Sequence, residues 1–193
     1  MAMPRSVHRA ASLSGLATPS VVSLVVIVAL SKSAGAQYSA GAQYEVSGHL
    51  GVAFPLATFT SAAGASSPTT IAENFNVNFP FGFGVKPNWS PVVFDLELVP
   101  EVHPNTGPTT FLVHPGVVMP LPDGWAVGVR AAFEVDQNSK GFTPLVIKGF
   151  PLLGYNVRWL VFVEGDLPVR FSQLSNGTSA TSVTFAVHTG LAF

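Results

Sequence analysis

Apolar and polar residues alternate with a period of two along several stretches of this chain. The stretch 182–193 is the clearest, because its odd-numbered positions carry Val, Phe, Val, Thr, Leu and Phe, and the positions between them carry Ser, Thr, Ala, His, Gly and Ala. The same alternation occurs at 44–54, 73–85 and 125–136. Strict alternation over ten or more residues predicts β-strands that have one apolar face.

Four less regular runs complete a set of eight predicted strands. They lie near 91–102, 109–119, 142–152 and 156–170. Short turns such as Pro122-Asp123-Gly124, where proline presets φ and glycine accepts a positive φ, alternate with longer polar connections near 55–71, 103–109, 136–141 and 171–181. Alternating short and long connections are typical of transmembrane β-barrels. We therefore expect an all-β fold, an eight-stranded antiparallel up-and-down barrel that spans a membrane.

Composition is consistent with a membrane location. Hydrophobic residues make up 48% of the chain, but charged residues make up only 10%, against roughly 25% in a typical soluble domain. The 15 Phe residues exclude a disordered chain. With 9 basic and 10 acidic residues, the chain is not expected to bind nucleic acid. The absence of cysteine excludes thiol chemistry and cysteine-ligated metals.

The two faces of the predicted strands differ in a way that sets the orientation of the barrel. One face is almost wholly apolar and rich in aromatic residues, and the other mixes small and charged residues. The interior of an eight-stranded barrel has room for packed side chains and little else, so we expect the aromatic face to meet lipid and the charged face to fill the lumen. The predicted lumen charges are Asp95, Glu97, Arg130, Glu134, Lys148, Arg158 and Glu164. Buried charges need partners, so these residues form either a salt-bridge network that fills the lumen or the ion pairs of a gated pore.

His49 and His188 form a second candidate group on the inward face. They lie on the first and last strands, which must pair to close the barrel, and each is five residues from a strand end. A histidine pair with Glu45 nearby could bind a metal ion. The alternative is that the imidazoles fill a narrow lumen by hydrogen bonding. We assign no metal, cofactor or catalytic residue.

The first 36 residues have the pattern of a secretory signal peptide. Arg5 and Arg9 precede a ten-residue apolar run at 21–30, which Ala34-Gly35-Ala36 follows as a cleavage site. A second such site at 40–42 lies within a repeat of SAGAQY. An inner-membrane anchor is the alternative, but ten strongly apolar residues are too few to span a bilayer, which takes about 20. The expected organisation is a signal peptide at 1–36, a flexible leader at 37–43 and a barrel at 44–193.

Residues 44–193 look like the small eight-stranded outer-membrane proteins of the OmpA/OmpX type. The terminal Phe193, with Leu191, Thr189 and Val187 at alternate positions before it, resembles the C-terminal signal read by the barrel assembly machinery. His188 stands where the family usually has glycine in this signal. The resemblance implies a monomer in the outer membrane of a Gram-negative bacterium, exported through the periplasm, in contact with outer-membrane lipid and lipopolysaccharide.

Four prolines fall inside the predicted strands: Pro80, Pro115, Pro144 and Pro168. Proline lacks the N–H that a sheet requires, and a closed barrel has no edge strand to tolerate it. We therefore expect that these prolines mark bulges or strand ends, or that the predicted strand boundaries are wrong.

The expected function is non-enzymatic, either envelope integrity or surface interaction. A narrow pore for ions or small solutes is the main alternative. A lipid-modifying enzyme is a weaker one, because His103 is the single histidine predicted near the outer rim, where Ser172, Ser175 and Asp136 also lie.

Overall fold

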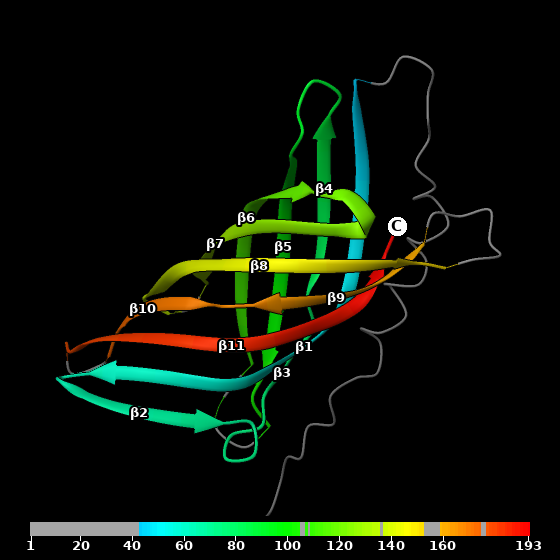
Figure 1. Cartoon of the computed structure of the whole chain (residues 1–193). Coiled ribbons are helices and arrows are strands. Elements are labelled where there is room, and N and C mark those ends of the chain that lie inside the picture. Colours follow the sequence, from blue (N-terminus) through cyan, green and yellow to red (C-terminus); the bar gives the residue numbers. More distant parts are fainter. Residues whose placement is uncertain (1–42, 105–106, 108, 136, 153–158, 175–176) are drawn as a thin grey trace, which may run out of the picture. The chain divides into compact units, whose positions relative to one another are not determined.

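Antiparallel β-strands make up the part of the protein that is described by the computed structural model, which covers 43–104, 107, 109–135, 137–152, 159–174 and 177–193 (Figure 1). The strands are β1 (Tyr44–Ala62), β2 (Ala65–Thr70), β3 (Val77–Asn78), β4 (Phe81–Pro87), β5 (Val93–Val102), β6 (Thr110–Pro120), β7 (Trp125–Glu134), β8 (Ser139–Pro151), β9 (Leu160–Asp166), β10 (Val169–Gln173) and β11 (Ser179–Ala192). One 3₁₀ turn, η3 (Pro122–Gly124), joins β6 to β7. Among these residues, no helix has the length and hydrophobicity needed to cross a membrane. The predicted signal peptide (1–36) and all of the predicted leader (37–43) except Gln43 lie outside the described residues.

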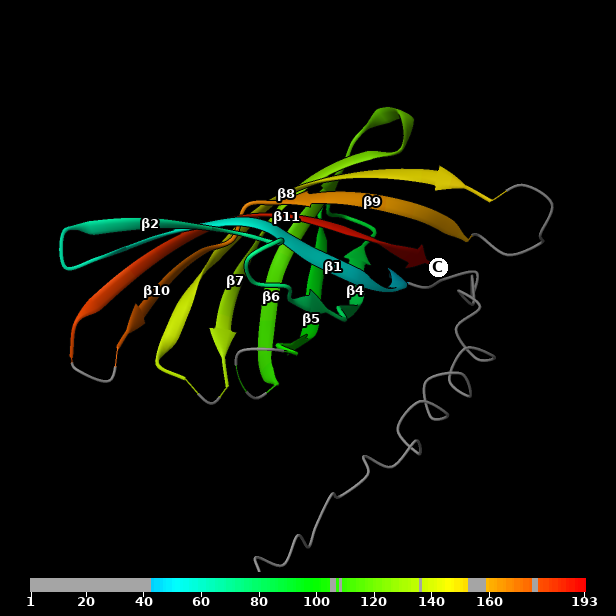
Figure 2. The same ribbon diagram turned by 90° about the horizontal axis from the view of Figure 1, so that it is seen from below.

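The strand pairings form a closed ring. Neighbouring strands pair in the order β1, β4, β5, β6, β7, β8, β9, β11. The pairing of β11 with β1 closes the ring. The closing pair continues to the last residue, because Gly48 and Phe193 exchange backbone hydrogen bonds of 2.8 and 2.9 Å. Viewed from below, β5 and β6 lie on one side of the ring and β8 and β9 on the other (Figure 2).

The described residues form eleven strands where the sequence predicts eight, and proline causes part of the difference. Pro80 divides the predicted strand 73–85 into β3 and β4. The pairing register with β5 is the same on both sides of the break, since Asn78 faces Glu101 and Phe81 faces Leu98. The carbonyl of Pro80 still accepts a 2.9 Å hydrogen bond from the Gly51 N–H. The interruption therefore removes a donor without shifting the strand.

A second proline break divides the predicted strand 156–170 into β9 and β10. Pro168 follows β9, and Pro144 lies beside the break on β8. The carbonyls of both prolines accept hydrogen bonds, from Thr184 N–H at 2.8 Å and Leu167 N–H at 3.0 Å. Pro115 and Pro144 stay inside β6 and β8, so the expectation that all four prolines end strands or form bulges is wrong for these two.

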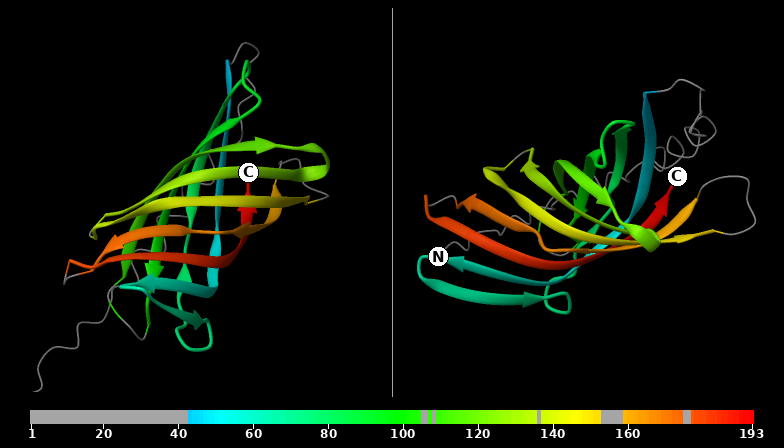
Figure 3. Two further views of the ribbon diagram at one scale, coloured as in Figure 1. Left: turned by 60° about the vertical axis from the view of Figure 1, so that its left-hand side comes forward. Right: turned by 45° about the horizontal axis from the view of Figure 1, so that its top comes forward.

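The remaining additional strand comes from the connection predicted at 55–71. Here β1 runs on to Ala62, turns through Ala63 and Gly64 at φ of 51° and 80°, and returns as β2. Two central residues with positive φ are the mark of a tight two-residue hairpin, and glycine adopts this conformation without strain. The hairpin lies beside the β10–β11 pair (Figure 3). The segment predicted as a loop is thus mostly strand, apart from 63–64 and 71.

Polar side chains are buried inside the ring and large apolar side chains are exposed outside it. Glu164 and His188 are each 1% exposed, whereas Phe83 is 57% exposed. The same alternation holds along β11, where Ala186 and His188 are buried and Phe185 is 51% exposed. This is the reverse of the distribution in a water-soluble protein.

Candidate functional site: a charged cluster inside the ring

Arg130 on β7 joins carboxylates from two other strands. Its Nε donates a 2.7 Å hydrogen bond to Asp95 Oδ2, and its Nη1 donates a 2.6 Å hydrogen bond to Glu164 Oε1. Nη1 also lies 3.4 Å from Glu97 Oε2. Alternation places Asp95 and Glu97 on the same face of β5, two residues apart. We call Arg130, Asp95, Glu97 and Glu164 the central cluster.

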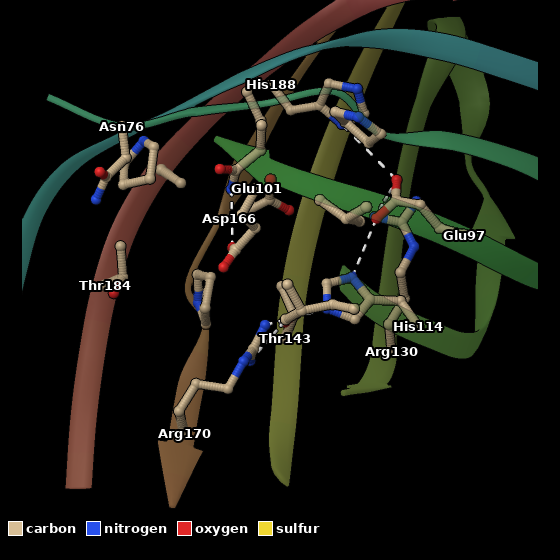
Figure 4. Close-up of a pocket in the computed structure, with 18 of the residues that line it drawn as sticks. Asn76, Glu97, Glu101, His114, Arg130, Thr143, Asp166, Arg170, Thr184 and His188 are labelled. Atoms are coloured by element: carbon tan, nitrogen blue, oxygen red, sulfur yellow. Dashed lines mark hydrogen bonds and ion pairs between the residues drawn. The ribbon is translucent and has the colours of Figure 1, made fainter. Parts of the chain in front are cut away.

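Glu97 is also surrounded by three imidazoles, those of His49, His114 and His188. Figure 4 shows His114 and His188 on either side of the Glu97 carboxylate. Its Oε1 lies 3.1 Å from His114 Nδ1, and its Oε2 lies 3.1 Å from His49 Nε2 and 4.0 Å from His188 Nδ1. His188 Nδ1 is closer to Glu164 Oε1, at 3.5 Å. Hydrogen bonds to a carboxylate compensate its loss of water, so these histidines allow Glu97 to be 3% exposed.

The central cluster lies between two cavities. The first, of about 310 Å³, is on the side of the β1–β2 hairpin, and Thr58 and Glu134 are among its lining residues. The second, of about 300 Å³, is on the side of Phe193, and Ser47 and Trp125 are among its lining residues. Arg130 lines both cavities. The cluster is therefore a polar partition across the interior of the ring.

The structure brings together four of the seven residues predicted as lumen charges, the members of the central cluster. Glu134 faces the same side of β7 as Arg130, but it lines only the first cavity and has no ion pair within 4.0 Å among the described residues. Four residues of strand separate it from Arg130, about 13 Å along the chain. Arg158 lies outside the described residues.

Lys148 does not point into the ring, and this prediction is wrong. It is paired with Trp125, which is 47% exposed. Along β8 it lies on the same, outward face as Val146 and Phe150. Its ammonium lies 5.0 Å from the centre of the Trp125 ring and donates a hydrogen bond to the carbonyl of Asp123. The error arose because Ile147 and Lys148 break the apolar alternation in this strand.

The two predicted histidines lie beside each other, and no hydrogen bond joins them. The ring centres of His49 and His188 are 6.2 Å apart, and both imidazoles face Glu97. Glu45, the predicted neighbour of the pair, lies 3.8 Å from Lys86 at the end of the strand. The carboxylate between the histidines therefore comes from β5, two strand positions from β1.

Three further residues belong to this site and were not among the predicted site residues. His114 binds Glu97, and Asp166 is buried two residues after Glu164. Phe162 is 4% exposed and meets the rings of His49 and His188 edge-on. All three occupy inward positions of their strands. Phe162 could have been predicted to face inward because it lies two residues before Glu164 on the same strand. Its apolar side chain instead suggested the outward face.

The donor atoms of Glu97, Glu164 and His188 lie within 4.8 Å of one another, a spacing at which they could hold a metal ion. However, Arg130 Nη1 is 2.6 Å from Glu164 and 3.4 Å from Glu97. The guanidinium thus supplies the positive charge that a metal would bring. This arrangement fits an ion-pair cluster better than a metal centre.

Phe193, predicted as part of an assembly signal with Leu191, is held at the closing pair. Its ring centre lies 5.2 Å from that of Trp159, and the ring covers Gly48. Leu191 faces Leu50 on β1 and Val161 on β9.

Comparisons with known proteins give one weak likeness. No family model matches the chain, and no curated protein matches it. Among solved structures, Neisserial surface protein A is similar at 11% identity with a TM-score of 0.24, over 74% of this chain and 95% of that one. Similarity at this level determines neither the fold nor the function of this chain.

Proposed function

We propose that the chain is an eight-stranded transmembrane β-barrel of an outer membrane. Because the register is unchanged across the proline breaks, β3 with β4 and β9 with β10 each act as one strand of the ring. β2 is the returning arm of a hairpin that extends β1. With these assignments the ring has eight positions, the size at which side chains fill the interior.

The distribution of polar and apolar residues is the observation that carries this proposal. Arg130, Glu164 and His188 are at most 2% exposed, whereas Phe133 and Phe185 are each about half exposed. Exposing so much aromatic surface to water would be costly, at roughly 25 cal/mol per Å². Lipid around the ring removes this cost, and the paired ring leaves no strand edge in the membrane.

We place the protein in the outer membrane of a Gram-negative bacterium, as a monomer. The signal peptide would direct its export to the periplasm, and the barrel assembly machinery would insert it into the membrane. Outer-membrane lipid and lipopolysaccharide are its expected contacts, and nucleic acid is not. Its role is non-enzymatic, in envelope integrity or surface interaction. The cluster supports a closed, structural lumen because its charges are bound to one another.

Two measurements test the membrane assignment. The folded protein should require detergent or lipid for solubility, and it should migrate on gels differently before and after heating. A chain that stays folded and soluble without detergent contradicts the proposal. For the role, a deletion strain should become more sensitive to agents that the outer membrane excludes, and the wild-type chain should restore resistance. If sensitivity is unchanged, surface interaction remains the role to pursue.

A narrow pore is the second candidate, and the pair of cavities favours it. The central cluster lies between two spaces of about 310 and 300 Å³. Opening the Arg130–Glu164 ion pair would connect them. Arg130→Gln and Glu164→Gln should then change unitary currents in planar bilayers, while Lys86→Gln, at the strand end, should not. Absence of steady currents from the wild-type protein contradicts this candidate.

The enzymatic alternative predicts a modified lipid A. His103 Nδ1 donates a hydrogen bond to Asn76 Oδ1 at 2.9 Å, and its Nε2 lies 3.4 Å from Thr110 Oγ1. These partners favour a structural hydrogen-bond network. Lipid A mass spectra should therefore be the same with and without the protein, and a new acylation state would overturn the non-enzymatic assignment.

A further inference from the structure

Lys140 and Lys148 are distinctive among the basic residues of the described strands. Lys86, Arg130 and Arg170 alternate with exposed apolar residues and so lie on inward positions. Lys140 and Lys148 instead lie on the outward face of one strand, β8. All carboxylates of the described strands lie on inward positions. The outward surface thus carries two positive charges and no negative one from these strands.

The two lysines are spaced to mark both boundaries of an apolar band. Eight residues of strand separate them, about 27 Å at 3.4 Å per residue. A strand tilted by about 40° rises roughly 20 Å over that length, and lysine side chains can extend further to reach the edges of a band about 25 Å tall. Phe142, Pro144 and Val146 occupy the outward positions between them.

The environments of the two ammonium groups differ. Lys148 is bound within the chain, to the carbonyl of Asp123 and over the rings of Trp125 and Phe150. Lys140 is exposed, and its ammonium group makes no hydrogen bond or ion pair with any described residue. Its charge is therefore available to a partner from outside these residues.

Phenylalanines surround Lys140 on the outward surface. Phe133 on β7 and Phe171 on β10 are its partners across the two neighbouring strands. Phe142 lies two residues along β8, and its ring centre is 6.4 Å from that of Phe171. These three side chains are 41–50% exposed. A cation within such an aromatic patch at a membrane boundary matches an amphiphile with acyl chains and an anionic headgroup.

We propose that Lys140 binds the phosphate of a membrane lipid in the leaflet on the hairpin side, with the lipid's acyl chains packed against Phe133, Phe142 and Phe171. The inference rests on the proposed membrane-spanning function and names the lipid chemistry that this surface takes. The positive charge of Lys140 favours a negatively charged phosphate. The apolar surface of the three phenylalanines favours a phosphate that carries acyl chains over a free anion.

Native mass spectrometry of the folded protein in a non-ionic detergent tests the site. The probes are phosphatidic acid and diacylglycerol with the same acyl chains. Phosphatidic acid should bind more strongly, and Lys140→Gln should weaken its binding about fivefold, the effect of one interfacial cation. Lys140→Arg should retain binding. Lys148→Gln is the matched control on the same strand and should change binding less than twofold.

Three results would overturn the inference: equal binding of both lipids, unchanged binding by Lys140→Gln, or displacement of the lipid by millimolar inorganic phosphate. Each can occur in a protein that folds and requires detergent, so each leaves the membrane assignment intact. A chain that is soluble without detergent would contradict the membrane assignment instead. Heat-dependent gel migration of every variant confirms that a loss of binding does not come from misfolding.

Discussion

The guanidinium of Arg130 on β7 donates a 2.6 Å hydrogen bond to the carboxylate of Glu164 on β9, two strands away around the ring. Both residues are at most 2% exposed. The contact passes over β8, so it ties together strands that share no backbone pairing. Because Nη1 also approaches Glu97, removing the guanidinium would leave buried carboxylates without their counter-charge.

Arg130→Met should therefore destabilise the protein strongly. Breaking a buried ion pair by removing one partner costs about 3–5 kcal/mol. Lys86→Met is the control, because the Lys86–Glu45 pair is 3.8 Å long and half-exposed, and such pairs contribute about 0–1 kcal/mol. Urea unfolding in lipid vesicles, followed by tryptophan fluorescence, measures both. Equal loss of stability in the two variants would contradict the role of the central cluster.

Phe162→Ala should create a cavity beside His49 and His188. Phe162 is 4% exposed and faces into the ring, and truncating a buried phenylalanine costs about 3–5 kcal/mol. Phe185→Ala should cost less, since Phe185 is 51% exposed and lipid can fill the space it leaves. The same unfolding measurement applies. A larger effect at Phe185 would show that the outward surface, and not the interior, dominates stability.

Gly190→Ala should weaken the pairing that closes the ring. A Cβ on Gly190 would overlap the carbonyl oxygen of Leu50 on β1 and would lie 2.7 Å from the Cα of Gly51. Backbone atoms cannot move aside as a flexible side chain can. Gly165→Ala is the control, because its Cβ would meet only Val146 Cγ1, at an ordinary 3.6 Å. We expect Gly190→Ala to fold in lower yield, judged by heat-dependent gel migration, and Gly165→Ala to resemble wild type.

Glu73, in the segment after β2, should titrate below the ordinary range of a glutamate. The pKa of Glu73 is lowered first by the backbone N–H of Thr70, at 2.7 Å from Oε2, and then by the Thr70 hydroxyl at 3.0 Å. A lowered pKa means that the carboxylate stabilises the fold above its unfolded pKa, and that this contribution is lost as pH falls through the folded value.

Carboxyl ¹³C NMR measures the Glu73 pKa directly. Thr70→Val removes the hydroxyl and keeps the N–H, so the pKa should rise part of the way toward its ordinary value. Thr69→Val changes a neighbouring hydroxyl that makes no such bond to Glu73 and is the control. An unchanged pKa in Thr70→Val would show that the backbone hydrogen bond alone accounts for the shift.

The period-two pattern by itself determined the class of secondary structure and the face to which most side chains belong. Successive residues of a strand point to opposite faces, so the even or odd position of a residue decides the face on which it lies. This rule alone places Asp95, Glu97, Arg130 and Glu164 inside the ring. The pattern also located most strand boundaries, because glycine, proline and polar clusters end the alternation. It was wrong for Lys148, where the alternation is irregular, and for the β1–β2 hairpin, whose polar residues resemble a loop.

Tertiary structure decided which inward residues meet. The face on which a residue lies does not determine its height along the ring axis or its place around the ring. Both depend on the strand register and on the order in which the strands pair. Arg130 and Glu134 share a face of β7, yet only Arg130 reaches the central cluster, because four residues separate them along the strand. Glu97 contacts His49, two strand positions away, through the pairing of β5 with β4 and of β4 with β1. Contacts across a closed ring join residues remote in sequence, so no local pattern in the chain can encode them.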